Sequence, residues 1–229
     1  MTLAAGCAGT REVPEVPFEV DLSWGPAAGP RTEVRLRGPD RGPLELRVRR
    51  VSAAGTWPPV PDACFGAELS GPVAARLVAG VDGSGCFDLP SVIEDPDRPA
   101  GPWLGVTIRH GARLVTLRAR GRPEPALLEL CGALDRSLPV RVDPWPPWLA
   151  AMRGGDPFRP GLTADPARAL ALVDGWRARE PGERALALDR FALLLALDRR
   201  DEAAAMLEEL RADPALRGLE QELRRSLRR

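Results

Sequence analysis

The segment from residue 143 to residue 160 constrains the fold most, because the spacing of apolar residues changes across it. Apolar and polar residues alternate before it, whereas apolar residues recur about every 3.6 positions after it. We therefore expect strands before this segment and helices after it. Its prolines and its glycine pair exclude a helix or a central strand, which leaves a linker or an ordered strap. Trp145, Trp148 and Phe158 favour the strap, since a solvated linker rarely carries large aromatic side chains.

The residues before this segment show the pattern of half-buried strands. Alternation is clearest at 18–24, 32–37, 44–49, 104–108 and 115–119. Gly/Pro-rich and Gly-containing turns join these strands into hairpins. With a further strand expected at 73–81 and an edge strand at 138–142, about seven short strands predict an antiparallel β-sandwich. One short helix is expected from Pro125 to Ser137.

Residues 81–90, Val-Asp-Gly-Ser-Gly-Cys-Phe-Asp-Leu-Pro, form a motif that supports the same fold. The motif resembles the hairpin of transthyretin-like or carboxypeptidase-regulatory-like β-sandwich modules. The resemblance implies a strand on either side of an Asp-Gly turn.

The residues after the proline-rich segment are expected to form a helical bundle. Thr163 or Asp165 caps the first helix, and the helix around Phe191 is apolar almost all round, so it is the central one. The run from 191 to 214 resembles a tetratricopeptide repeat, with Asp198 where the repeat has its interhelix glycine. The predicted fold class is therefore α+β in two parts. The expected divisions are a tether at 1–12, a sandwich at 13–143, a strap at 144–160 and a bundle at 161–229.

Leu3-Ala4-Ala5-Gly6-Cys7 resembles the lipobox of bacterial lipoproteins, in which the cysteine carries the lipid. The charged and hydrophobic leader of such a motif would lie upstream of Met1. The resemblance implies a chain anchored in the bacterial envelope through Cys7, in the periplasm or at the outer membrane. If the match is fortuitous, the expected location is the cytoplasm.

The remaining cysteines allow one intrachain disulfide at most. Cys131 lies among leucines on a helical face and is expected to be a buried thiol. Cys64 and Cys86 lie in strand-like segments next to loops, so they are the expected pair in an oxidising compartment.

The sequence carries little that indicates catalysis. His110 is the only histidine, and it falls in a predicted turn, where we expect it to be exposed and without a role. Ligands at metal-site spacing and a phosphate-binding loop are lacking, so we expect neither a metal nor a cofactor. Arginine supplies all the basic charge and acidic residues balance it, which excludes the basic excess typical of nucleic-acid binding.

The expected function is that of a non-catalytic envelope lipoprotein that binds or assembles with a protein partner. An enzyme with a cleft between the sandwich and the helices is the alternative. Glu33 and Glu45 share a face with a stripe of four arginines, Arg35, Arg37, Arg47 and Arg49, and favour a solvated outer face for it. Trp176 is expected to seal the bundle against Phe158 and Trp148 of the strap, and the alternative is that it stands in a groove as an anchor for a bound segment. The candidate partner-binding residues are Trp176, Trp145, Trp148, Arg35, Arg37, Arg47 and Arg49.

Overall fold

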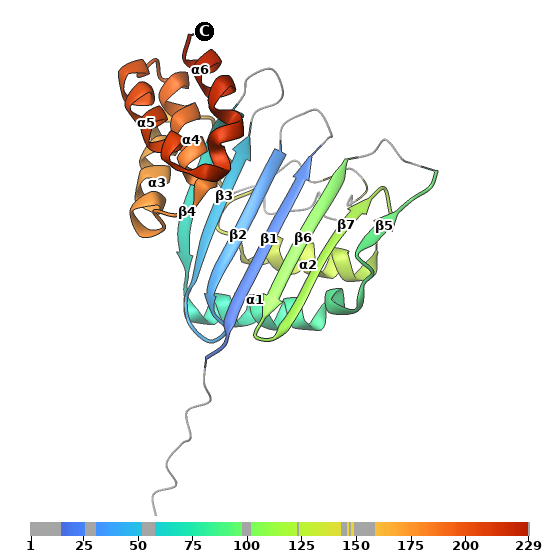
Figure 1. Ribbon diagram of the computed structural model, residues 1–229. Coiled ribbons are helices and arrows are strands. Elements are labelled where there is room, and N and C mark those ends of the chain that lie inside the picture. The colour runs from blue at the N-terminus through green and yellow to red at the C-terminus, as the bar shows by residue number, and fades with distance from the viewer. Residues whose placement is uncertain are drawn as a thin grey trace, which may run out of the picture.

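The computed structural model describes residues 15–25, 31–51, 58–97, 102–122, 124–142, 146, 148 and 159–228. The fold is α+β, with the strands in the first half of the chain and a helical bundle at the end (Figure 1). The strands are β1 (Pro17–Gly25), β2 (Arg31–Pro39), β3 (Leu44–Val51), β4 (Pro61–Leu69), β5 (Val92–Glu94), β6 (Trp103–His110) and β7 (Arg113–Arg120). They form one sheet in the order β4-β3-β2-β1-β6-β7-β5, antiparallel throughout except where β5 pairs with β7.

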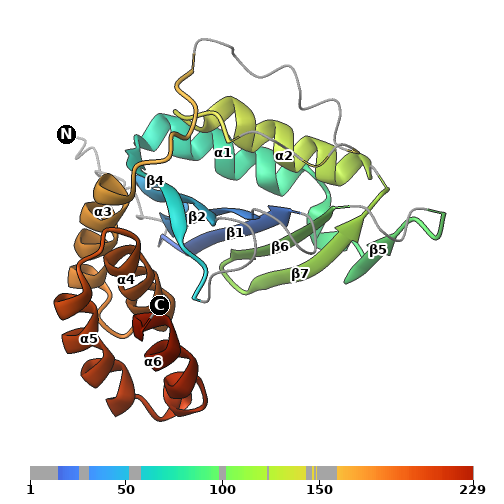
Figure 2. The same cartoon turned by 90° about the horizontal axis from the view of Figure 1, so that it is seen from above.

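Two long helices cover one face of this sheet, which we call the inner face. They are α1 (Gly71–Gly83) and α2 (Pro125–Ser137), and both lie on the same side in Figure 2. The inner-facing side chains of β1 are Phe18, Val20, Leu22 and Trp24, each 2% exposed or less. Because the strands alternate, their other side chains point to the opposite face, which we call the outer face. The half-buried strands predicted from the alternation of apolar and polar residues are thus confirmed as β1, β2, β3, β6 and β7.

The expectation of a second sheet is wrong for the part of the chain that the structure describes. The strand predicted at 73–81 is part of α1, which supplies the apolar cover that a second sheet would supply in a sandwich. Pro72 stands in the first turn of this helix, where its missing N–H costs no hydrogen bond. The buried residues Ala74, Leu77, Val78 and Val81 recur at helical spacing.

The hairpin expected at 81–90 is also absent from the described fold. This stretch holds the end of α1 and a short 3-10 helix, η1 (Cys86–Asp88). Gly85 between them has φ of 79°, a left-handed conformation that a glycine adopts without strain. The edge strand expected at 138–142 is not a sheet strand either, since Arg141 forms only an isolated bridge to Gly161. The predicted helix from Pro125 to Ser137 is confirmed as α2.

Helices α1 and α2 approach each other closely at Gly80. A Cβ on Gly80 would lie 2.8 Å from the Cβ of Ala133, closer than two carbon atoms approach without displacement. We expect Gly80→Ala to lower the free energy of unfolding by about 1–3 kcal/mol through overpacking. Gly83→Ala in the same helix is the control, because a Cβ there meets no atom within 4 Å. Urea unfolding of both variants checks this, and equal midpoints would contradict the close approach.

The helical bundle consists of α3 (Pro166–Arg179), α4 (Arg184–Ala196), α5 (Arg200–Ala212), η3 (Pro214–Leu219) and α6 (Glu220–Arg228). Asp165 caps α3 by accepting a hydrogen bond from the backbone N–H of Arg168. Phe191 in α4 is fully buried in the bundle, whereas Leu188 and Leu195 are only partly buried. None of the helices in the described residues is long and apolar enough to cross a membrane.

The expected disulfide does not form, because its two cysteines belong to different cores. Cys64 stands opposite Arg49 on the outer face of β4 and packs against the bundle, whereas Cys86 lies in the core under the inner face. Both are free thiols, as is the buried Cys131. Burial raises the pKa of Cys64 to about 12, so its thiol stays protonated at neutral pH.

Candidate functional site

The outer face carries polar side chains in rows that cross the strands. One row runs through Arg49, Glu33, Ser23, Gly105 and Arg118. The next row runs through Gly66, Arg47, Arg35, Asp21, Thr107 and Thr116. The charged residues lie mostly on β2 and β3, and the small or hydroxyl-bearing residues lie mostly on β1, β6 and β7. The bundle covers only the β4 side of this face, so none of the described helices lies over β6 and β7 on this side (Figure 2).

Carboxylates of the bundle neutralise the arginine stripe on β2 and β3. Nη2 of Arg47 lies 2.5 Å from Glu180, and Nη1 of Arg35 lies 3.2 Å from Glu183. Arg37 reaches Glu180 at 3.7 Å. Glu180 ends α3 and Glu183 precedes α4, so the turn between these helices lies on the stripe.

The solvated outer face expected for the stripe is therefore wrong on this side of the sheet. The cross-strand pair of Arg49 with Glu33 does form, whereas Glu45 pairs with Arg47 of its own strand at 3.1 Å. The helices nevertheless cover the stripe, and the side chain of Arg47 is only 7% exposed. These arginines bind the chain's own helices through Glu180 and Glu183. Their positions along β2 and β3 in the sequence do not predict this role.

Trp176 fixes the bundle to the sheet at the same place. This side chain is 3% exposed, and a Cβ on Gly66 of β4 would lie 3.3 Å from its ring. The guanidinium of Arg47 lies 5.4 Å from the ring centre, within the range of a cation–π contact. The expected seal against Trp148 is wrong, because Trp148 belongs to the core of the sheet and not to that of the bundle. Phe158, the other expected partner of Trp176, lies outside the described residues.

One carboxylate of the bundle, Asp189, is buried against the sheet. It pairs with Arg49, which also pairs with Glu33. Burial raises the pKa of Asp189 to about 6, and the attraction of Arg49 offsets this only in part. Burial acts in the same direction on Glu33, but Arg49 and Arg31 outweigh it and lower the pKa of that carboxyl.

Asp189 should make stability depend on pH. The folded chain binds a proton on Asp189 below about pH 6, whereas the unfolded chain binds it only near 3.8, so stability rises as the pH falls between these values. From pH 7 to pH 5 we expect a gain of about 1 kcal/mol. The lowered pKa of Glu33 changes the stability only below the ordinary pKa of 4.5, which lies outside the range from pH 7 to pH 5.

The matched variant is Asp189→Asn, which removes the titrating group and keeps its shape. Urea unfolding of both chains at pH 7 and pH 5 measures the difference. We expect the wild-type chain to gain stability relative to the variant at pH 5. An identical change in both chains would show that Asp189 does not titrate in this range.

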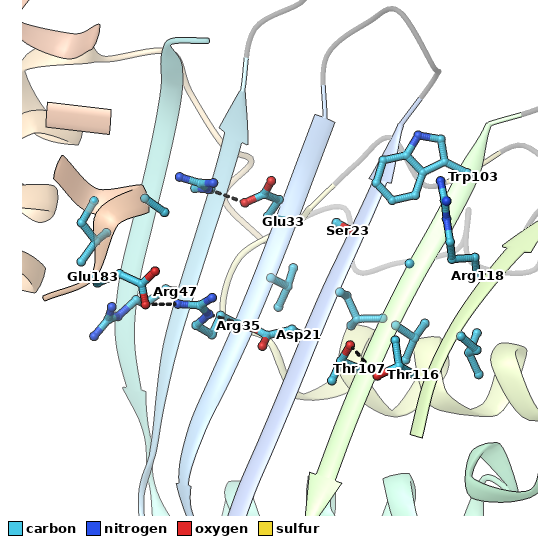
Figure 3. A pocket seen from close by; sticks show the side chains of 18 of the residues that line it. Asp21, Ser23, Glu33, Arg35, Arg47, Trp103, Thr107, Thr116, Arg118 and Glu183 are labelled. Carbon is cyan, nitrogen blue, oxygen red and sulfur yellow. Dashed lines mark hydrogen bonds and ion pairs between the residues drawn. The ribbon is translucent and has the colours of Figure 1, made fainter. Parts of the chain in front are cut away.

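A groove with a volume of about 430 Å³ lies where the bundle meets the outer face (Figure 3). Its floor comes from β1, β2, β3, β6 and β7, and one wall comes from α3, α4 and the turn between them. The residues that line it are Asp21, Leu22, Ser23, Glu33, Val34, Arg35, Arg47, Arg49, Trp103, Gly105, Val106, Thr107, Thr116, Leu117, Arg118, Trp176, Glu183, Ala185 and Leu186. The arrangement offers hydroxyl groups, the half-buried indole of Trp103 and fixed charges.

The carboxylate of Asp21 on the groove floor is held in place. Its Oδ1 accepts a hydrogen bond of 2.7 Å from Nε of Arg35, whose Nη1 reaches Glu183 on the wall. Burial raises the pKa of Asp21, against the lowering effect of Arg35. Thr107 and Thr116 lie side by side beyond it, with their hydroxyl oxygens 3.3 Å apart. These contacts organise the floor for hydrogen bonding with an occupant.

The sequence-predicted residues are divided between this groove and other places. Trp176, Arg35, Arg47 and Arg49 line the groove, and Arg37 lies beside it on the same face. Trp148 is buried elsewhere and donates from Nε1 to the carbonyl of Pro102 at 2.9 Å. Cys7 and Trp145 lie outside the described residues.

Sequence reasoning did not single out the β6–β7 side of the groove. Trp103, Gly105 and Thr107 alternate with the buried residues of β6, and Thr116 and Arg118 do the same in β7. A signal was available in the sequence, because apart from Arg118 these outward residues are small, hydroxyl-bearing or aromatic, whereas a plain solvated face carries mostly charged residues. The groove lies between sheet and helices, where the enzyme alternative places its cleft.

His110 lies away from the groove. The expectation that it is exposed in a turn is wrong. Its side chain is only 16% exposed, and Nδ1 lies 2.9 Å from a carboxylate oxygen of Asp82 at the end of α1. Its ring packs edge-on against Phe18, with 5.6 Å between the centres. His110 thus links the end of β6 to α1. Among the described residues, no three His, Cys, Asp or Glu side chains form a group that could hold a metal ion.

The chain was compared with known proteins. No family model matches the sequence, and the search of curated proteins finds no relative.

Proposed function

We propose that the chain is a non-catalytic lipoprotein of the bacterial envelope that binds a segment of a protein partner in the groove. The observation that carries this proposal is the pairing of the groove's carboxylates with arginines. Asp21, Glu33 and Glu183 are each paired with arginine, so they are suited to shaping a surface more than to transferring protons. The hydroxyl-bearing floor and Trp103 remain for a ligand.

The helical part serves in this proposal as a tetratricopeptide-like module that walls the groove. Support comes from Asp198, which stands where the repeat has its interhelix glycine. Its φ of 55° is left-handed, the conformation for which glycine is favoured and which Asp also tolerates. Helices α4 and α5 flank this residue, as the two helices of one repeat would.

The anchor is tested through Cys7. Metabolic labelling with a palmitate analogue in the native organism should label the chain and place it in the membrane fraction. Cys7→Ser should lose both the label and the membrane association. A mature chain without lipid on Cys7 would contradict the anchor and leave the groove proposal standing.

The binding function is tested with a photo-reactive amino acid at Thr107 on the groove floor. Irradiation of intact cells should give a cross-linked partner, identified by mass spectrometry, that recurs between preparations. The same amino acid at Arg76, which is exposed on α1 on the far side of the sheet, is the control and should not capture it. Equal capture from both positions, or none from Thr107, would contradict binding in the groove.

A further inference from the structure

The two sides of the outer face differ in how their arginines are neutralised. On β2 and β3 each outward arginine has carboxylate partners from the sheet or the bundle. Strands β6 and β7 contain arginines and no Asp or Glu at all. Arg113 on β7 faces the helices and reaches Asp82 of α1 at 3.6 Å. Arg118, on the outer face of β7, has no carboxylate within ion-pair distance among the described residues. Arg118 also lines the groove.

Arg118 lines one end of the groove together with Ser23, Trp103 and Gly105, and we call this end the hollow. Gly105 stands opposite Arg118 on one side and opposite Ser23 on the other. A Cβ on Gly105 would lie 3.1 Å from Oγ of Ser23 and 3.1 Å from the ring of Trp103. Oγ of Ser23 and the indole of Trp103 thus occupy the space over Gly105, and together with the guanidinium of Arg118 they border the hollow (Figure 3).

The three groups around the hollow fit a carboxylate. The guanidinium of Arg118 lies 5.7 Å from the ring centre of Trp103, so the indole holds the arginine side chain near the hollow. Arginine binds a carboxylate through two parallel hydrogen bonds, and a hydroxyl at the side can donate a third. The indole ring would cover the CH₂ groups of an acidic side chain.

We propose that this hollow binds the side-chain carboxylate of an aspartate or glutamate in an extended segment of the protein partner. The proposal rests on the proposed function and names the chemistry of its ligand. A volume of about 430 Å³ is much larger than a carboxylate, so the occupant continues beyond the hollow. The continuation passes the hydroxyls of Thr107 and Thr116 and the apolar Leu186 on the wall, which suits a peptide.

The test titrates the full chain with three probes. These are a blocked hexapeptide of alternating valine and glutamate, its glutamine counterpart and inorganic phosphate. The indole N–H signal of Trp103 in the NMR spectrum, assigned with Trp103→Phe, reports occupancy. We expect the glutamate peptide to bind at least about tenfold more tightly than the glutamine peptide, and to weaken as salt is added.

Arg118→Gln should remove this tenfold preference, while the exposed position of Arg118 leaves the fold intact. Arg113→Gln is the matched control, because Arg113 lies on the same strand but contacts Phe87 and Asp82 and does not line the groove. It should bind both peptides as the wild-type chain does.

Several outcomes would overturn the proposal. They are equal affinity for both peptides, binding of neither, an unchanged preference in Arg118→Gln, or tighter binding of phosphate than of the glutamate peptide. If cross-linking from Thr107 still captures a partner in those cases, the groove function stands and only the acidic ligand is wrong. If Thr107 captures nothing, the function itself fails.

Discussion

Replacing Phe191 with alanine is expected to lower the free energy of unfolding by about 3–5 kcal/mol. The side chain is fully buried in the core of the bundle, so its removal leaves a cavity that the neighbouring helices cannot fill. Urea unfolding followed by circular dichroism measures the change.

Leu188→Ala in the same helix is the control for Phe191. Leu188 is only partly buried, so its truncation should cost clearly less. A loss below about 1 kcal/mol for Phe191→Ala would mean that α4 is not the central helix of the bundle.

Replacing Trp176 with alanine is expected to have an effect of similar size, about 3–5 kcal/mol. The indole fills the space between α3 and the outer face, so its loss opens a cavity and leaves Arg47 without its aromatic contact. The melting midpoint should fall by on the order of 10 °C for a chain of this length. Limited proteolysis should also release the helices more readily, since their contact with β4 is weakened.

Trp176→Phe is the control, because it keeps most of the apolar contact and should lose less stability. The competing interpretation makes Trp176 an anchor for the partner. An unchanged midpoint together with lost capture of the partner would favour the anchor and contradict the seal against β4.

The strands could be predicted from the sequence because a half-buried sheet imposes a local pattern. Val20 and Leu22 on β1, and Val106 and Ile108 on β6, face the helices and alternate with outward polar residues. The period of two needs only a few consecutive residues to be recognised. The single sheet was not predicted, since the pattern says that a face is covered and not whether a sheet or helices cover it.

The error in α1 has a different origin. Val73 to Val81 is rich in β-branched and apolar residues, which favours a strand by composition. The buried positions 74, 77, 78 and 81 have the spacing of a helix, and Pro72 is a typical first-turn residue. Periodicity was the better guide here than residue type.

The groove could not be predicted, because its wall and floor come from distant parts of the chain. Arg47 and Glu180 are 133 residues apart, and Arg35 and Glu183 are 148 apart. A stripe of arginines with nearby glutamates looks the same whether water or a helix covers it. Asp189 gave a signal that was not used, since a lone carboxylate within a helix that is apolar almost all round must find a cation when it is buried.

The most direct test of the binding function is to map the partner on the chain. The segment that cross-links to position 107 would be synthesised and titrated into isotope-labelled full-length protein. We expect the largest backbone shifts at Ser23, Gly105 and Thr116 on the outer face. Shifts confined to α5 and α6 or to β5, with the outer face unchanged, would contradict a binding site in the groove.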